Sequence, residues 1–302
     1  MKDSQLSATL RRILQDTRAE IEADKSQQSL KRLKQIIPHA PPLRSFHGAL
    51  KEGRALIAEV KEESPSQGRM RPDNVAHCVD AYRDSKLVKA LSVLTSRTHF
   101  GKNMTVDWMK SIKERVGKPV LRKDFIIEPY QIFQARAYGA DAILLMANIL
   151  TSEEMASLSE IAFELGLDVL FETHCPEEVK QLPPSAKIIG INCRSFKGGS
   201  TNFKLARFMR QWLGTKNDQS VSRSRFDYIG ELPPNTIKIA ESGVSAETCE
   251  EVFAKGFHSI LVGTSLLMDK RGVQAALEDF ESRLLPGAKT DRPRAQFETV
   301  PA

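Results

Sequence analysis

The sequence contains no hydrophobic run of the length that a membrane-spanning helix needs. Such a helix takes about 18 consecutive apolar residues, and the apolar runs of this 302-residue chain are much shorter. Its first 25 residues, MKDSQLSATLRRILQDTRAEIEADK, carry acids and lack the apolar segment of a signal peptide. They do not have the composition of a transit peptide either. We therefore expect a cytoplasmic protein that does not bind membranes.

Cysteine is scarce, and its four occurrences lie far apart. No two of them have the Cys-x-x-Cys spacing of metal and redox sites; they are Cys78, Cys175, Cys193 and Cys249. This pattern favours a reducing compartment with ordinary thiols. We expect Cys193 to be a small packing residue, and we predict no metal site.

Several short catalytic motifs are missing as well. No Gly-x-Gly-x-x-Gly follows the first predicted strand, which argues against a dinucleotide-binding sheet. No serine lies in a Gly-x-Ser-x-Gly elbow. Glu172 and His174 do not form a zinc-binding helix motif. His99 is expected in a surface loop.

Basic residues outnumber acidic ones, with 44 Lys and Arg against 38 Asp and Glu, so that the net charge is +6. Much of the excess lies near the chain ends and in the segment 214–226. Aromatic residues, which serve as stacking platforms on nucleic-acid-binding surfaces, are not interleaved with these charges. We expect solvated surfaces and no nucleic-acid partner, although a positive field would attract an anionic small substrate.

The beginning of the chain has a helical pattern. Apolar residues recur at helical spacing in two stretches, which predicts two helices that end at Pro38. The prolines that follow favour an extended linker. We predict an N-terminal helical extension over residues 1–45 that packs on a catalytic domain over residues 46–285. Residues 286–302 lack apolar periodicity and are expected to form a flexible tail.

The middle of the chain alternates between strand patterns and helix patterns. Eight short apolar or β-branched runs predict strands: ALIAEV, VKALSVL, PVLRK, AILLM, DVLFE, IIGIN, TIKIAE and SILVG. Eight helix patterns follow them, at residues 74–85, 106–114, 129–138, 152–165, 176–181, 204–212, 246–255 and 273–282. Eight strand–helix units in about 250 residues predict an α/β fold, a single (βα)8 TIM barrel. An open doubly wound sheet is the competing topology.

Charged residues stand at the ends of the odd-numbered predicted strands. They are Glu59, Lys123, Glu172 and Glu241. In a closed barrel the odd strands contribute to one interior layer, and active sites lie where the strands end. Carboxylates that crowd around one ammonium repel each other, so one of them is pushed towards its neutral form. Such a group can supply both an acid and a base.

Three consecutive charges end the third predicted strand, in PVLRKDF. Successive residues of a strand point to opposite sides. We therefore expect Lys123 to face the cavity, and Arg122 and Asp124 to face structural partners.

Two glycine-containing loops predict a phosphate site. Ser242-Gly243 follows the seventh strand, and Gly263-Thr264-Ser265 follows the eighth. Small residues leave backbone N–H groups accessible, and a short helix that starts in the second loop would favour an anion. These two loops form the recurrent phosphate site of such barrels.

Six stretches of the sequence together resemble the indole-3-glycerol phosphate synthase family. They are LIAEVKEESPSQG, LSVLTSRTHFGKN, PVLRKDFIIEPYQIFQARAYGADAILLM, IIGINCRSF, IAESGV and ILVGTSLLM. The resemblance extends from about Leu6 to Leu285. It implies a phosphate-binding (βα)8 barrel without metal or organic cofactor. It also implies the conversion of 1-(2-carboxyphenylamino)-1-deoxyribulose 5-phosphate into indole-3-glycerol phosphate, with loss of CO₂ and water, in tryptophan biosynthesis.

The resemblance implies roles for five residues. Lys123 would protonate the substrate carbonyl oxygen as the ring closes, and Glu172 would act as base or acid in the dehydration. Glu59 would hold the cationic intermediate and orient the lysine. Asn192 and Ser242 would position the ribulose-derived chain.

Further residues are implied to bind the substrate. Lys61 would contact its carboxylate or phosphate, and the sequence does not decide between Lys61 and Lys123 as proton donor. Phe100 and Phe125 would form walls of the anthranilate pocket, where aromatic rings gain from stacking and burial. The other predicted contacts belong to strand ends and their loops: Ser64, Arg194 and Glu241 for the substrate, and Gly243, Gly263, Thr264 and Ser265 for its phosphate.

Two other functions are compatible with such a barrel. One is a different phosphosugar enzyme, such as a sugar isomerase, and the other is a barrel repurposed for binding through its basic segments. For the preferred interpretation we expect a monomer whose partner is the small phosphosugar–anthranilate substrate. We expect no fused isomerase domain in this chain.

Overall fold

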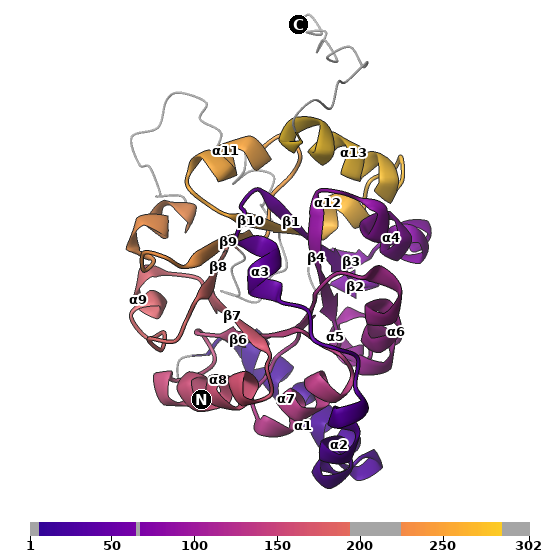
Figure 1. Ribbon diagram of the computed structural model, residues 1–302, viewed down its shortest axis with the longest axis vertical. Coiled ribbons are helices and arrows are strands. Elements are labelled where there is room, and N and C mark those ends of the chain that lie inside the picture. Colours follow the sequence, from indigo (N-terminus) through magenta and orange to yellow (C-terminus); the bar gives the residue numbers. More distant parts are fainter. Residues whose placement is uncertain (1–5, 65–66, 194–224, 286–302) are drawn as a thin grey trace, which may run out of the picture.

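The computed structural model describes residues 6–64, 67–193 and 225–285, and in this part of the chain eight parallel strands close into a barrel (Figure 1). They follow one another in the order β1-β10-β9-β8-β7-β6-β5-β4. Their bounds are β1 Ala55–Val60, β4 Val88–Leu94, β5 Val120–Lys123, β6 Ala142–Met146, β7 Asp168–Thr173, β8 Ile188–Asn192, β9 Ile237–Glu241 and β10 Ser259–Val262. Because β1 pairs with both β4 and β10, the predicted (βα)8 barrel is confirmed and the open sheet is wrong.

Helices surround the barrel (Figure 1). Their bounds are α4 Pro72–Asp84, α5 Arg97–Phe100, α6 Val106–Val116, α7 Pro129–Ala137, α8 Ser152–Glu164, α9 Pro176–Val179, α11 Cys249–Ala254, α12 Thr264–Leu267, α13 Val273–Leu284 and the 3₁₀ helix η3 Arg225–Glu231. A two-stranded hairpin, β2 Glu63–Ser64 and β3 Gly68–Arg69, follows β1. The predicted helix at residues 204–212 lies outside the described residues.

Helix α8 begins where its sequence predicts, because two side chains satisfy backbone N–H groups that have no partner within the helix. The Thr151 hydroxyl accepts from the Glu154 N–H at 3.2 Å, and the Glu154 carboxylate accepts from the Thr151 N–H at 2.9 Å. This capping box fixes the direction in which the chain leaves the end of β6.

The N-terminal residues form two helices, as predicted: α1 Ala8–Gln27 and α2 Leu30–Ile36. Pro38 lies in a 3₁₀ turn, η2 Ile37–His39, so the helical path ends slightly later than predicted. Ile21 of α1 and Leu33 of α2 pack against Tyr130 and Ala137 of α7. No helix in the described ranges is long and apolar enough to cross a membrane.

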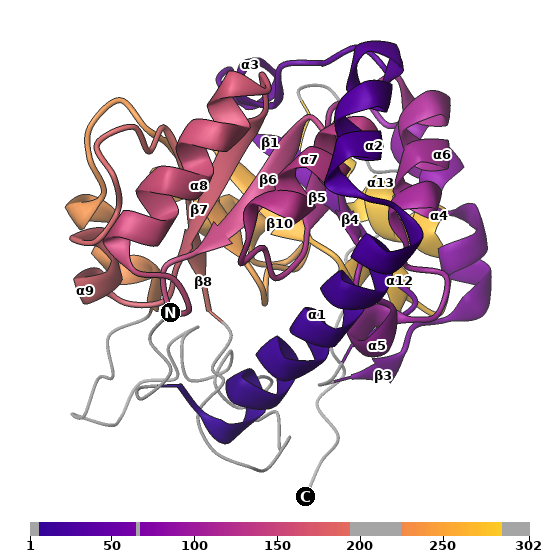
Figure 2. The ribbon, with the colours of Figure 1, turned by 90° about the horizontal axis from the view of Figure 1, so that it is seen from below.

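The two ends of the barrel differ in what covers them. Helix α3, Phe46–Leu50, lies across the end where the strands begin, with Phe46 and Leu50 fully buried. Figure 2 shows α1 at the opposite end, on the same side of the barrel as α5 and β3. The hydrophobic core therefore closes one end, and loops with α1 surround the other.

A buried ion pair ties the linker after α2 to the barrel. Asp141, at the start of β6, accepts hydrogen bonds from the Lys113 ammonium at 2.6 Å and from the Val120 backbone N–H at 2.7 Å. It also accepts from the backbone N–H of Arg44 in the linker at 2.6 Å. The side chains of Lys113 and Asp141 are both 0% exposed. Three protein donors therefore make the hydrogen bonds to the Asp141 carboxylate that water would make in an exposed one.

Candidate active site

A cavity of about 510 Å³ opens at the end of the barrel where the strands finish. Most of its polar lining comes from residues that the sequence singles out: Glu59, Lys61, Lys123, Glu172, Asn192, Glu241, Ser242, Gly243, Gly263, Thr264 and Ser265. Their gathering follows from parallel strand direction, which places all eight carboxyl ends at one end of the barrel.

Lys123 lies between two carboxylates. Its ammonium donates to Glu172 Oε2 at 3.0 Å and to Glu241 Oε2 at 2.9 Å. Lys123 ends β5, Glu172 is the last residue but one of β7, and Glu241 ends β9, so the contact exists only in the closed barrel. The Lys123 side chain is 14% exposed and those of both glutamates are 1% exposed. The ammonium is the most accessible of the three groups, and all three residues line the cavity.

Glu59 forms a second ion pair, with the Lys61 ammonium. Both residues are almost completely buried. The predicted orientation of Lys123 by Glu59 stays a prediction. Glu59 still acts on Lys123 through its negative charge.

Two glycines leave room for the carboxylates. A Cβ atom at Gly190 of β8 would collide with Glu241 Oε1, and one at Gly263 would collide with Glu59 Oε1. Gly190 was not among the predicted site residues. Its signal in the sequence is a glycine within an otherwise apolar strand, which often marks a close approach by another group.

The surrounding charges keep Lys123 protonated. Burial alone would lower the pKa of its ammonium, but the negative charges of Glu172, Glu241 and Glu59 hold that pKa above its usual range. A buried ammonium that stays charged is available as a proton donor or as an electrostatic clamp for an anion.

The two carboxylates that contact Lys123 differ in proton affinity. Burial raises the pKa of Glu241 to about 7, and the nearby charge of Glu172 adds to the rise. Burial also disfavours ionised Glu172, but Lys123, His174 and a hydrogen bond from Asn192 lower its pKa to about 2. This arrangement provides an ionised and a readily protonated carboxyl group side by side, as the charge pattern predicts.

Two aromatic rings form one wall of the cavity. Phe100 and Phe125 stack with their centroids 6.2 Å apart and their planes at 9°. His99 contacts both rings edge-on and its side chain is only 12% exposed. The expected surface loop for His99 is therefore wrong, because α5 turns this residue inward.

Sequence reasoning missed much of the apolar lining. Leu94, Leu144, Met146 and Leu261 line the cavity, together with Gln67 from the loop after β1. The leucines and the methionine lie near strand ends, and the inward alternation of barrel strands could have identified them. Their presence makes the cavity suitable for a molecule with one apolar part.

The loops after β9 and β10 form a cradle with small side chains. Ser242 and Gly243 both have positive φ, at 66° and 76°, which turns the backbone sharply after β9. The Ser265 hydroxyl donates to the Val244 carbonyl at 2.9 Å and so joins the two loops. Thr264 and Ser265 begin α12, where backbone N–H groups have no partner within the helix.

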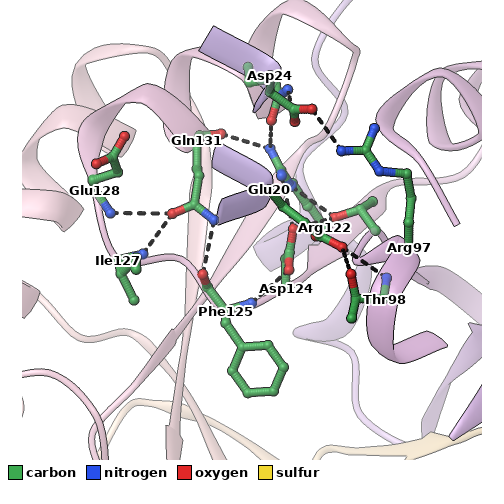
Figure 3. A network of polar contacts seen from close by, with 12 residues as sticks. Glu20, Asp24, Arg97, Thr98, Arg122, Asp124, Phe125, Ile127, Glu128 and Gln131 are labelled. Atoms are coloured by element: carbon green, nitrogen blue, oxygen red, sulfur yellow. Dashed lines mark hydrogen bonds and ion pairs between the residues drawn. The ribbon is translucent and has the colours of Figure 1, made fainter. Parts of the chain in front are cut away.

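Arg122 is buried behind the cavity, as its position next to Lys123 predicts. Its guanidinium donates to the Thr95 hydroxyl at 3.0 Å, to the Gln131 carbonyl at 2.9 Å and to Asp124 Oδ2 at 2.9 Å (Figure 3). Asp124 also accepts from the Phe125 N–H at 2.8 Å. Asp124 itself borders the cavity, so its expected orientation away from the cavity is only partly correct.

The same network reaches the N-terminal helix, which the sequence did not indicate (Figure 3). Asp24 of α1 accepts from Arg97 of α5 at 2.9 Å and from Gln134 of α7 at 2.9 Å. Glu20 of α1 accepts from the Thr98 N–H at 2.8 Å. Helix α1 thus holds the segment that carries the aromatic wall.

The structure does not place two predicted substrate contacts at the cavity. Ser64 is in the hairpin strand β2, where its hydroxyl accepts from the Gln67 N–H at 3.2 Å, and it is not among the described residues that line the cavity. Arg194 lies outside the described residues. A role of either residue in substrate binding stays a prediction.

A closed barrel with an ionisable cluster at its strand ends is the arrangement of a (βα)8-barrel enzyme. The sequence model of the family described as indole-3-glycerol phosphate synthase matches residues 10–280. The chain belongs to this family, whose members are carboxy-lyases of tryptophan biosynthesis.

Curated relatives agree with this assignment. The chain is 34% identical to an indole-3-glycerol phosphate synthase of Streptomyces griseus, over 90% of this chain and 94% of the relative. It is 36% identical to one of Mycolicibacterium smegmatis, over 84% and 87% respectively. Among solved structures, 3-hexulose-6-phosphate synthase of Salmonella typhimurium aligns with a TM-score of 0.55 over 76% of this chain and 98% of that chain. Its 18% identity supports the shared fold alone.

Proposed function

We propose that the cavity at the strand ends converts 1-(2-carboxyphenylamino)-1-deoxyribulose 5-phosphate into indole-3-glycerol phosphate, CO₂ and water. The observation that carries the proposal is the position of Lys123. Its ammonium is held by two carboxylates and faces a cavity that has an aromatic wall on one side and a backbone cradle on another. The substrate has a matching anionic, aromatic and phosphorylated part.

Ring closure needs an acid. The ring carbon that bears the carboxylate attacks the ketone carbon, and Lys123 donates its proton to the carbonyl oxygen, which becomes a hydroxyl group. Loss of CO₂ then returns the bonding electrons to the ring. We assign this step to Lys123 rather than to Lys61, because Lys61 is 2% exposed and bound by Glu59, whereas the Lys123 side chain is 14% exposed.

Dehydration needs an acid for the leaving hydroxyl group and a base for the departing proton. We assign acid–base work in this step to Glu172, with Asn192 fixing its carboxylate. Glu59 would stabilise the cationic intermediate and Lys61 an anionic group of the substrate. Low-dielectric surroundings strengthen each of these interactions.

Substrate binding would use the remaining lining. The stacked rings of Phe100 and Phe125 offer a flat apolar surface for the anthranilate ring. The ribulose-derived chain would contact Ser242 and Glu241. The phosphate would be bound by backbone N–H groups of the two cradle loops: Gly243, Gly263, Thr264 and Ser265.

A fluorescence assay tests the function. The purified protein should generate indole fluorescence from the carboxyphenylamino substrate and none from a panel of sugar phosphates that isomerases use. Lys123→Ala and Glu172→Gln should each lower kcat by roughly 100-fold or more, which is typical for loss of an acid–base group. Lys110→Ala, at a lysine whose side chain is 47% exposed, is the control and should retain full activity.

Full activity in both site variants would contradict the assignment of the site. No indole formation by the unaltered, folded protein would contradict the function. Salt-sensitive nucleic-acid binding in place of catalysis would support the alternative of a binding barrel.

We also propose that the protein is a cytoplasmic monomer that works without metal or organic cofactor. The division of the chain into residues 1–45, 46–285 and 286–302 likewise stays a prediction. Size-exclusion chromatography with light scattering, activity in the presence of a chelator, and limited proteolysis test these points.

A further inference from the structure

His174 lies next to the candidate active site without having been assigned a role. It follows β7, two residues beyond Glu172, and its side chain is 10% exposed. Its Nε2 atom is 3.4 Å from Glu172 Oε1, and its Nδ1 atom is 3.4 Å from Glu178 Oε2. The imidazole ring therefore stands between a carboxylate of the cavity and a carboxylate of α9.

The two oxygens of Glu172 have different neighbours. Oε2 accepts from the Lys123 ammonium, whereas Oε1 faces the imidazole. Glu178 fixes the other side of the ring, since it also accepts from the His174 backbone N–H at 2.7 Å. Lys123 thus contacts one oxygen of the Glu172 carboxylate, and His174 faces the other.

The charges around His174 favour its protonated form. Burial alone would lower the pKa of the imidazole, but the carboxylates of Glu178, Glu172 and Glu241 raise that pKa above its usual value. Lys123 is the opposing cation, and it lies beyond Glu172. Two other ionisable groups lie near Glu178, and both stay neutral, because burial raises the pKa of the Tyr228 hydroxyl of η3 and that of the Cys175 thiol.

We propose that His174 is a positioning residue that stores the proton with which Glu172 acts in dehydration. This inference rests on the acid–base role proposed for Glu172. Contacts at about 3.4 Å are long for hydrogen bonds, but such contacts often tighten only when the substrate is bound. The ring needs to move by only a few tenths of an ångström.

Within the dehydration step the proton balance closes without exchange with solvent, whereas Lys123, which gives up its proton in ring closure, regains one from solvent before the next turnover. The Nε2–H bond breaks and an O–H bond forms at Glu172 Oε1, which leaves a neutral imidazole with its proton on Nδ1. Glu172 passes this proton on to the leaving hydroxyl group as it receives it, because its own low pKa does not allow it to keep the proton, and water departs. Glu172 next removes the proton that the substrate loses as the double bond forms, and returns it to Nε2 of His174.

The test compares two products of the same turnover. In His174→Gln, ring closure and CO₂ release should proceed as in the unaltered protein, whereas indole formation should slow by roughly tenfold or more. A rapid-mixing experiment should therefore show a burst of about one CO₂ per enzyme before indole fluorescence rises. KM should fall in proportion to kcat, because the slowed step follows the irreversible release of CO₂ and kcat/KM is therefore unchanged.

A second variant addresses the same role without altering the imidazole. Glu178→Gln keeps an oxygen that can accept from the His174 N–H but removes the negative charge. The pKa of His174, followed by its imidazole NMR signals, should fall, and the alkaline limit of kcat should move to lower pH. His77→Gln, at an exposed histidine on α4, is the control and should change neither quantity.

The outcomes separate the two proposals. If the unaltered protein forms no indole, the proposed function fails. If it is active and Glu172→Gln is inactive, but His174→Gln releases CO₂ and indole together at the normal rate and with the normal pH profile, the role of His174 is wrong. A rise in KM with unchanged kcat would also overturn it. If His174→Gln does not fold, as circular dichroism would show, Glu178→Gln decides.

Discussion

Glu172 and Glu241 carry the same chemical group and contact the same ammonium, yet their proton affinities differ widely. Both side chains are buried to the same extent. The difference comes from the other neighbours of Glu172, because His174 and Asn192 stabilise its ionised form. For Glu241 the destabilisation of the ionised form by burial dominates. Position in the cluster, not residue type, therefore decides which carboxylate can hold a proton at neutral pH.

The raised pKa of Glu241 makes a prediction about stability. Between its unfolded value, near 4.5, and about 7, the folded protein binds the proton more tightly than the unfolded chain. The contribution of Glu241 to the free energy of unfolding is therefore lost as pH rises through this window. Glu241→Gln removes this pH-dependent contribution. The free energy of unfolding of the variant, relative to that of the unaltered protein, should therefore rise by on the order of 1 to 3 kcal/mol as the pH is raised from 5 to 8.

Urea unfolding of both proteins at several pH values measures this difference. A difference that stays constant from pH 5 to pH 8 would show that Glu241 has an ordinary pKa. Carboxyl NMR signals give a second readout, since a titration near pH 7 should be missing from the variant.

Strand β8 shapes the site because one of its residues, Gly190, has no side chain. The carboxylate of Glu241 on the neighbouring strand occupies the free space. Strand pairing brings the two residues together, because β8 and β9 run parallel with Gly190 opposite Ile239. A methyl group here would not disturb the backbone conformation but would displace the carboxylate.

Gly190→Ala should therefore damage catalysis more than folding. The displaced Glu241 would release Lys123 from one of its two partners, and we expect kcat/KM to fall by roughly tenfold or more with a loss of stability of about 1 to 3 kcal/mol. Gly230→Ala is the matched control, because an added Cβ there meets no atom within 4 Å. Equal activity of the two variants would refute the steric role of Gly190.

Helix α1 supports the site from outside the barrel. Its carboxylates Glu20 and Asp24 hold α5, which carries Phe100, and Asp24 also reaches Gln134, a partner of Arg122 (Figure 3). A helix outside the barrel thus supports both the aromatic wall and the strand end that carries Lys123. Polar contacts of this kind leave no periodic signal in a sequence.

One buried ion pair joins three distant parts of the molecule: the linker after α2, the barrel and an outer helix. Asp141 binds Lys113 of α6 and the backbone of Arg44. Burial raises the pKa of Asp141 and lowers that of Lys113, so each charged form depends on the other. Loss of one partner would leave the other charge uncompensated in the interior.

Asp141→Asn should lower the free energy of unfolding by about 3 to 5 kcal/mol, because the Lys113 ammonium loses its counter-ion. Urea titration monitored by circular dichroism measures the change. Asp80→Asn removes an exposed partner of Arg83 and Arg115 and should cost about 0 to 1 kcal/mol. Similar losses of unfolding free energy in both variants would mean that the buried ion pair contributes no more to stability than an exposed one.

The barrel and the set of strand-end residues could be predicted from the amino-acid sequence alone. Alternating strand and helix patterns specify the eight units, and parallel strands oblige their carboxyl ends to meet, so Lys123, Glu172 and Glu241 could be placed together in advance. The predicted strand bounds differ from those observed by one residue at most. The two helices before the barrel were equally evident from their apolar spacing.

The folded structure was needed to establish which charges pair, how Gly190 makes room for a carboxylate, and where α1 lies. Lys123 and Glu241 are 118 residues apart, and which oxygen faces which cation depends on closure of the barrel. The inward position of His99 and the contact between His174 and Glu172 have the same origin. Proton affinity depends on burial and on neighbouring charges in space, and the order of residues along the chain contains neither quantity directly.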